Sequence, residues 1–211
     1  MVRWCRITSW QDRDGHNWLQ TPYYDVEGNL TGVQFRNLDY GSRLKVQGSS
    51  GDSPADSLNN FSNQFSKNFE ERSDDPKVPQ PRFRFPKGSK CNIYNLQILP
   101  LLKPGEPLYI AEGCSDCWSL LSAGHKAIAI PSATTLHQNE TLKVFKRLGE
   151  LHTCLHIFPD QDIPGEKLYL QLTLLSAQAG LTLIRHSLPQ GCKDFSEFYL
   201  LNLEPEVLLT R

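Results

Sequence analysis

The sequence predicts an α/β fold in which residues 106–211 form a mostly parallel sheet with flanking helices, preceded by a smaller α+β subdomain over 1–105. Two observations carry this prediction. From position 107 onward, short apolar runs alternate with longer runs of helical character, a pattern typical of βαβ units. Within the first region, residues 47–81 are rich in Ser, Asn, Asp, Gly and Pro at both edges, which indicates an inserted polar segment.

Four strands and four helices are expected in the second region. The strands are placed at 108–111, 126–130, 152–158 and 181–187, and the helices at 115–123, 139–151, 164–179 and 194–201. Gly124 and Gly180 would end the first and third helices. Pro164 suits a first helical turn, and Asn139 would cap the second helix. Right-handed crossovers between parallel strands would place functional groups outside their carboxyl ends.

The first region is expected to contain a hairpin and a short helix. Strand-like runs at 22–26 and 30–36 flank Glu27, Gly28 and Asn29, which favour a turn. Inside the polar segment, apolar residues recur at helical spacing, and the helix they predict would either dock on the body of the protein or bind a partner. These residues are Leu58, Phe61, Phe65 and Phe69.

Composition indicates a soluble, cytoplasmic protein. Of the 211 residues, 39% are hydrophobic and 21% are charged, and no apolar run approaches the roughly 18 residues that would span a membrane. The first ten residues lack the apolar stretch of a signal peptide. Six cysteines without regular spacing suit reduced thiols. Residues 1–105 carry a net charge of +3 and the remainder −4, either as surface scatter or as separate phosphate-binding and cation-binding regions.

Acidic residues follow three of the predicted strands. Glu112 ends the first strand, Asp160 and Asp162 follow the third, and Asp194 follows the fourth. Carboxylates that meet in one crevice repel one another unless a divalent cation joins them. Mg²⁺ prefers oxygen ligands and retains waters that phosphate oxygens can replace. The sequence therefore predicts a magnesium site for chemistry on phosphates, unless these are ordinary loop residues.

These motifs resemble the TOPRIM fold, in the form found in DnaG-like DNA primases of mobile elements. The stretch from Tyr109 to Gly124 is similar to the primase motif in which Glu-Gly-x-x-Asp opens a helix and glycine closes it. The segment from Phe158 to Gly165 is similar to the Asp-x-Asp-x-x-Gly motif. Lys193 to Glu197 is similar to a Lys-Asp-x-x-Glu element, although Ser196 stands where primases usually carry a second acid.

Upstream segments are similar to the same family. Arg36 ends the predicted hairpin, residues 81–90 match a basic segment, and Tyr94 with Asn95 match the element after it. Five positive charges and no acid lie between Lys77 and Lys90, with Phe83 and Phe85 interleaved. Such a segment could contact phosphates and stack bases. It could also be an edge strand whose two rings are buried and whose arginines are solvated, and both interpretations can hold at once.

The resemblance implies roles for individual residues. Catalysis would rest on Glu112, Asp160 and Asp162, and these three with Asp194 would bind Mg²⁺ or Mn²⁺. Gly113, Asp116, Lys193 and Glu197 would support the site. Nucleotides or DNA would contact the basic residues of the first region, which are Arg36, Arg82, Arg84, Lys87 and Lys90.

The function implied by the resemblance is that of a primase catalytic core, a nucleotidyltransferase that joins ribonucleotides on single-stranded DNA. Its partners would be single-stranded DNA and ribonucleoside triphosphates, together with a replicative helicase or a separate zinc-binding module. A TOPRIM nuclease and a non-catalytic nucleic-acid-binding module are alternatives. No zinc is predicted, because 34 residues separate the Cys114/Cys117 pair from His152 and His156, and the histidines should pack in the core.

Cys114 and Cys117 offer a third alternative, a thiol oxidoreductase. A Cys-x-x-Cys motif at a helix start is the setting of a thioredoxin-like redox site, because a helix N-terminus lowers the pKa of a thiol. This alternative leaves the downstream acidic residues unexplained, and a structural pair of small thiols is the simpler interpretation.

Overall fold

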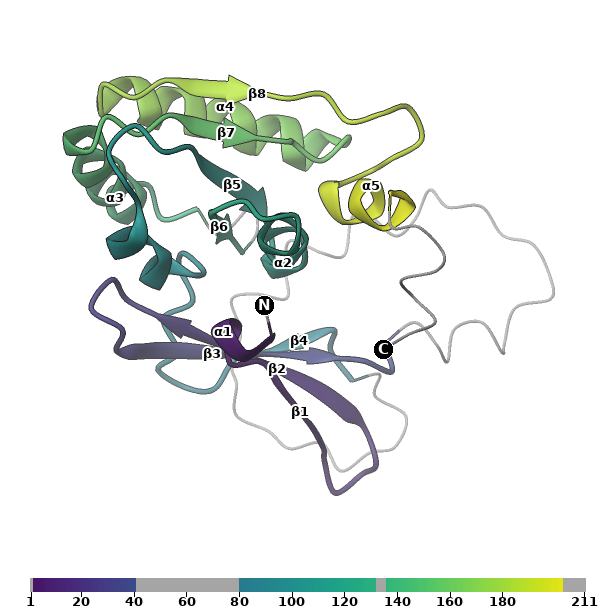
Figure 1. Ribbon diagram of the computed structural model, residues 1–211. Coiled ribbons are helices and arrows are strands. Elements are labelled where there is room, and N and C mark those ends of the chain that lie inside the picture. The colour runs from purple at the N-terminus through teal and green to yellow at the C-terminus, as the bar shows by residue number, and fades with distance from the viewer. Residues whose placement is uncertain (1, 41–79, 132–135, 203–211) are drawn as a thin grey trace. The chain divides into compact units, whose positions relative to one another are not determined.

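The computed structural model describes residues 2–40, 80–131 and 136–202 (Figure 1). The chain divides into two compact units of non-consecutive segments. The first unit comprises 1–6, 22–32 and 90–211, and the second comprises 7–21 and 33–89. The predicted helix at 58–69 and nearly all of the polar segment at 47–81 lie outside the described residues.

The first unit contains a four-stranded parallel sheet. Its strands are β5 (Leu108–Glu112), β6 (Ala127–Ile130), β7 (Leu155–Ile157) and β8 (Leu183–Arg185), in the order β6-β5-β7-β8. This confirms the predicted α/β class and mostly parallel sheet. β7 and β8 are shorter than predicted, and His152 is instead in a turn with a φ of 51°.

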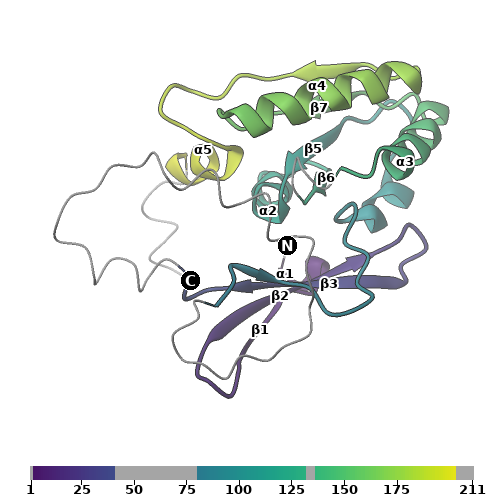
Figure 2. The same ribbon diagram turned by 180° about the vertical axis from the view of Figure 1, so that it is seen from behind.

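Four helices flank the sheet and alternate with its strands (Figure 1; Figure 2 from behind). They are α2 (Cys114–Ser122), α3 (Gln138–Glu150), α4 (Ile163–Gln178) and α5 (Phe195–Leu201). Pro164 is in the first turn of α4, and Gly124 and Gly180 follow α2 and α4 with positive φ, as predicted. The predicted cap at Asn139 is wrong, because α3 already includes that residue and begins after His137.

The main core lies between the strands and α3 and α4. All four residues of β6 are buried, and β5 and β7 alternate buried with half-buried residues over most of their length. The helices α3 and α4 each pack one apolar stripe against these strands. Removal of this apolar area from water is the largest favourable contribution to the folding of the unit. The fully buried members of the core are Leu108, Ile110, Ile128, Ile130, Phe145, Leu148, Leu155, Ile157, Leu168 and Leu172.

Segments distant in sequence complete the first unit. Helix α1 (Val2–Cys5) brings Trp4 to Asn95, whose side-chain oxygen accepts a 3.0 Å hydrogen bond from the indole. The Asn95 amide also donates to the Ala127 carbonyl at 2.7 Å. Asn95 has a left-handed φ of 64° and immediately precedes the 3₁₀ helix η3 (Leu96–Leu101). The bond to Ala127 attaches Asn95 to the edge strand β6, and the bond from Trp4 attaches α1 to Asn95.

A second sheet, of order β1-β2-β3-β4, consists of β1 (Thr8–Gln11), β2 (Asn17–Tyr24), β3 (Leu30–Asn37) and β4 (Phe83–Arg84). β2 and β3 form the predicted hairpin, whose turn is closed by a hydrogen bond from the Asp25 amide to the Asn29 carbonyl. β1 pairs antiparallel with β2, and β4 pairs antiparallel with β3. Within the described residues, the helices are too short or too polar to cross a membrane.

Candidate metal centre

The candidate site lies at the carboxyl end of the parallel sheet. β5 ends at Glu112, and Asp116 follows in the first turn of α2. Asp160 lies in the segment that connects β7 to α4, and Asp194 immediately precedes α5. Three carboxylates meet there: one oxygen from each of Asp116, Asp160 and Asp194 lies within 4.8 Å of the others. We refer to these three residues as the aspartate cluster.

Asp116 is held in the aspartate cluster by α5. It is only 5% exposed, and its carboxylate accepts hydrogen bonds from the Ser196 amide, at 3.0 Å, and from the Ser196 hydroxyl. Burial raises the pKa of Asp116 to about 6, aided by the Asp194 charge and opposed by the Ser196 hydrogen bonds. Ser196 therefore fixes the Asp116 carboxylate without adding a further negative charge to the site.

Asp160 has the most unfavourable electrostatic environment in the site. Burial raises its pKa to about 8, and repulsion from Glu112, Asp116, Asp194 and Asp162 contributes to the increase in that order. Its Oδ1 atom is buried, and no described residue forms a hydrogen bond with it. A buried acceptor without a partner is costly, and a divalent cation among these oxygens would satisfy it and cancel the repulsion. The residues present therefore fit a magnesium ion.

Gly165 allows the Asp160 segment to pass against the start of α4. A β-carbon at Gly165 would lie 2.4 Å from the Asp160 carbonyl oxygen and 2.8 Å from the Asp160 β-carbon. Only glycine leaves room for this approach. The glycine of the Asp-x-Asp-x-x-Gly motif is thus a packing requirement for the position of Asp160.

Asp162 has a different environment from Asp160. It caps α4, because its Oδ1 accepts a 2.9 Å hydrogen bond from the Gly165 amide. Its Oδ2 lies 3.5 Å from the Lys193 ammonium. Partial burial lowers the pKa of Lys193, but the charges of Asp162 and Asp160 outweigh it, so the pKa is raised overall. Asp162 therefore contributes to the site through a helix cap and an ion pair, outside the aspartate cluster.

The structure thus distributes the predicted site residues over several positions. The aspartate cluster contains Asp160 and Asp194, together with Asp116, for which only a supporting role was expected. Glu112 is close enough to be the largest charge acting on the pKa of Asp160. Glu197 accepts a 2.7 Å hydrogen bond from the Lys193 amide, and Gly113, with a φ of 86°, joins β5 to α2.

Sequence reasoning did not single out Ser196 as a residue of the site. The sequence indicated only that Ser196 stands in place of an expected acid. Its hydrogen bond to Asp116 joins residues 80 positions apart and depends on how α2 packs against α5, so no local pattern predicts it.

The predicted nucleotide-binding residues belong to both units. Arg36, Arg82, Arg84 and Lys87 are in the second unit, whereas Lys90 begins the last segment of the first. Phe83 and Phe85 are 37% and 36% exposed, and Arg84 is half-buried with its guanidinium 4.3 Å from the centre of the Trp18 ring. The alternative of an edge strand with buried rings and solvated arginines is therefore wrong for both phenylalanines and for Arg84.

The thiols do not have the environment of a redox site. Cys114 and Cys117 are both buried, and neither forms a disulfide. The Cys114 sulfur lies 3.1 Å from the Tyr23 hydroxyl, and the Cys117 sulfur donates to the Ala127 carbonyl at 3.4 Å. Burial raises the pKa of Cys117 well above that of a free thiol, whereas a redox cysteine needs an accessible thiolate. This environment favours a structural pair.

The histidines are arranged differently from the prediction. His156 packs against other rings but is only half-buried, with its Nδ1 2.8 Å from the His186 Nε2 and its ring against Tyr109. His152 is exposed in the turn before β7, so its predicted burial is wrong. Among the described residues, the aspartate cluster is the one group of three or more His, Cys, Asp and Glu side chains close enough to share a metal ion.

The raised pKa values predict that the metal-free protein loses stability as the pH rises. In the folded state, Asp160, with its pKa raised to about 8, and Asp116, with its pKa raised to about 6, each hold a proton up to that pH, whereas the unfolded chain has released both protons above about pH 4. Folding stability therefore falls as the pH rises through this window. Mg²⁺ requires the deprotonated carboxylates, so it should raise the Tm more at pH 8 than at pH 5.

Thermal unfolding followed by circular dichroism, in EDTA and in millimolar MgCl₂, measures both effects. An increase in Tm on adding Mg²⁺ that is the same at both pH values would contradict the prediction.

Comparison with known proteins shows which folds this chain resembles. Residues 109–199 match the family described as Toprim-like. No curated protein matches the sequence. Among solved structures, the primase fragment of the bacteriophage T7 primase-helicase protein shares the fold, with 16% sequence identity and a TM-score of 0.58. The Aquifex aeolicus primase, with its zinc-binding and RNA polymerase domains, has 18% identity and a TM-score of 0.57. The RNA polymerase domain of Mycobacterium tuberculosis primase DnaG has 16% identity and a TM-score of 0.55.

The part of the chain that holds the parallel sheet and the acidic residues at its carboxyl edge thus matches a Toprim-like family model and has the fold of the three primase structures. The matches to the three primase structures cover 98%, 95% and 94% of the chain, so the chain as a whole has the fold of a DnaG-type primase core. It spans 67%, 42% and 55% of those structures. The M. tuberculosis domain was solved in complex with double-stranded DNA.

Proposed function

We propose that this protein is the catalytic core of a DNA primase and joins ribonucleotides on a single-stranded DNA template. The observation that carries the proposal is a buried oxygen of Asp160 to which no described residue donates a hydrogen bond, set among acidic groups at the carboxyl edge of the parallel sheet. An arrangement that is electrostatically unfavourable by itself becomes favourable when a divalent cation is bound, and primer synthesis requires such a cation beside the phosphates.

The aspartate cluster would hold Mg²⁺ or Mn²⁺, which would neutralise charge that develops on the phosphoryl group. Asp160 would be the metal ligand that a cation stabilises most, because the other carboxylates repel its charge. Ser196 holds the Asp116 carboxylate in a fixed orientation. Glu112, by its effect on Asp160, would organise the cluster or accept a proton. Lys193, held beside Asp162, would present its ammonium group to the phosphates of the incoming nucleotide.

The second unit would supply contacts to nucleic acid. Arg82, Arg84 and Lys87 lie in or beside β4 and would bind phosphates of the template or the triphosphate. Arg36 and Lys90 are proposed for the same role. The partners would be single-stranded DNA and ribonucleoside triphosphates. One similar structure is part of a primase-helicase protein and another carries a zinc-binding domain. A helicase and a zinc-binding module are therefore proposed as further partners. We propose that the protein acts in the cytoplasm and is encoded by a mobile element.

Template-directed dinucleotide synthesis tests this proposal. The purified chain is incubated with single-stranded DNA, labelled ribonucleotides and either Mg²⁺ or Mn²⁺, and products are resolved on gels. We expect template-dependent dinucleotides with the metal and none in EDTA. Glu112→Gln should reduce synthesis, because a neutral amide cannot accept a proton or organise a cation.

The same reactions distinguish the alternatives. Metal-dependent cleavage of the DNA without synthesis would identify a Toprim-like nuclease. Neither reaction, together with no effect of Mg²⁺ on the Tm, would identify a non-catalytic nucleic-acid-binding module. Either result would overturn the proposal.

A further inference from the structure

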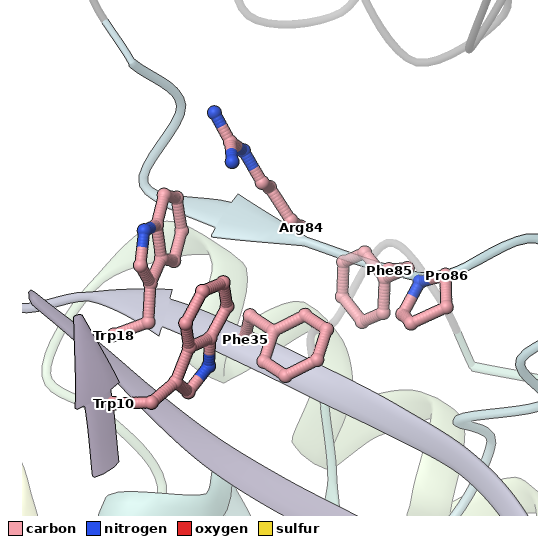
Figure 3. A pocket seen from close by; sticks show the side chains of 6 residues that line it. All are labelled: Trp10, Trp18, Phe35, Arg84, Phe85 and Pro86. Atoms are coloured by element: carbon pink, nitrogen blue, oxygen red, sulfur yellow. The ribbon is translucent and has the colours of Figure 1, made fainter. Parts of the chain in front are cut away.

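The second unit contains a pocket built from aromatic rings. It has a volume of about 220 Å³, and its lining comes from β1, β2, β3 and the segment that includes β4 (Figure 3). The strand registers assemble it, because Trp10 pairs with Trp18 and Phe35 pairs with Arg84. The residues that line the pocket are Trp10, Trp18, Phe35, Arg84, Phe85 and Pro86.

The rings around the pocket are fixed on one side and open on the other. Trp18 is fully buried, and its indole donates a 2.8 Å hydrogen bond to Asp12. Trp10 is 42% exposed and meets the Phe35 ring edge-on, with centroids 5.8 Å apart. Phe85 is more than a third exposed, and Figure 3 shows it beyond Phe35, with Arg84 on the Trp18 side. Flat aromatic surface thus remains available for a further ring.

The charges beside the pocket indicate the kind of ligand. The guanidinium of Arg84 lies over Trp18 and that of Arg82 lies 5.2 Å from the Phe83 ring centre. Lys87 follows the last lining residue, Pro86, and the segment from 82 to 90 contains no acid. Aromatic faces next to several cations suit a planar base attached to a phosphate backbone. An apolar peptide would use the rings but not the cations.

We propose that this pocket holds an unpaired base of single-stranded DNA, stacked on Trp10 and Phe85, with the adjoining phosphates on Arg84 and Lys87. This inference deepens the proposed function, because it identifies the template as the ligand of the second unit. Base binding itself requires no metal and no catalytic carboxylate, so it can be measured separately.

Binding of matched oligonucleotides to the full chain in EDTA tests the proposal. The probes are a fluorescein-labelled oligodeoxythymidylate and an abasic oligonucleotide of the same length, which has the same phosphates but no bases. Trp10→Ala should weaken binding of the oligodeoxythymidylate about fivefold or more, the lower limit for the loss of one base stack. It should leave the abasic probe unchanged.

Two further variants make the test specific. Trp10→Leu retains an apolar side chain in β1 but has no aromatic face, so it should behave like Trp10→Ala while preserving the circular dichroism spectrum. Tyr40→Ala removes an exposed ring of the same unit that does not line the pocket, and it should bind both probes as the native chain does.

The proposal is overturned if Trp10→Leu binds oligodeoxythymidylate like the native chain, if it loses both probes equally, or if the native chain does not prefer bases over abasic sites. The last result would leave the pocket to an apolar peptide. If primer synthesis is observed together with any of these results, the proposed function stands and only the base-binding proposal fails. If the chain binds bases but does not synthesise primers, the base-binding proposal stands and the proposed function fails.

Discussion

Replacing Asp160 by Asn is expected to lower primer synthesis at least about 100-fold and to raise the stability of the metal-free protein at the same time. The loss follows because even an outer-shell partner of a metal ligand is worth about 10- to 100-fold in metal affinity or activity, and Asp160 would be a direct ligand. The gain follows because an uncharged amide removes repulsion from Glu112, Asp116 and Asp194. We expect the Tm at pH 8 in EDTA to rise by about 2–4 °C, which corresponds to about 1 kcal/mol.

The matched control is Asp14→Asn, which changes the net charge equally but at an exposed position of the second unit. It should leave primer synthesis and the Tm within error of the native values. If Asp160→Asn were less stable than the native chain in EDTA, the carboxylate would be a structural partner and the metal assignment would fail. Retention of synthesis in this variant would refute the catalytic assignment.

Gly165→Ala is expected to have the second largest effect. The new methyl group would lie 2.4 Å from the Asp160 carbonyl oxygen, so the backbone that carries Asp160 must move. Overpacking of this kind costs about 1–3 kcal/mol, and we expect the free energy of unfolding to fall by about 2 kcal/mol in urea titrations. Primer synthesis should fall about 100-fold, because a displacement of about 1 Å at a reacting group has an effect of this size.

Gly149→Ala provides a helical control for this substitution. Gly149 lies inside α3, and an added β-carbon would approach the Ala179 carbonyl only to 3.1 Å. Alanine favours a helix by up to about 1 kcal/mol over glycine, which offsets this contact. The variant should unfold within about 1 kcal/mol of the native chain and retain its activity. If both substitutions had equal effects on synthesis, the close approach of Gly165 to Asp160 would not be the cause.

Local sequence was sufficient to predict the elements of the first unit. Apolar runs, Pro164 at a helix start and glycines at helix ends act through bonds within a few residues, so β5, β6, α2 and α4 were predicted within one or two positions. The helix α3 was also predicted within one position. The larger errors are in β7 and β8, which are each shorter than predicted, with His152 in a turn before β7.

The candidate site shows the same division between local and distant effects. Glu112, Asp160 and Asp194 could be predicted as neighbours, because parallel strands deliver their carboxyl ends to one edge. The difference between Asp160 and Asp162 could not be predicted, since both follow β7. One oxygen of Asp162 is used by the α4 cap and the other faces Lys193, whereas an oxygen of Asp160 lies near Asp116, which α5 holds through Ser196.

The sequence by itself determined the alternation of strands and helices, the parallel sheet and the gathering of acidic residues at its edge, because each depends on periodicity and on local backbone preferences. Only the tertiary structure decided which carboxylate oxygens meet, and that Trp10, Phe35 and Phe85 line one pocket. The physical reason is that both arrangements depend on strand register and helix packing, which join residues tens of positions apart and leave no local pattern in the chain.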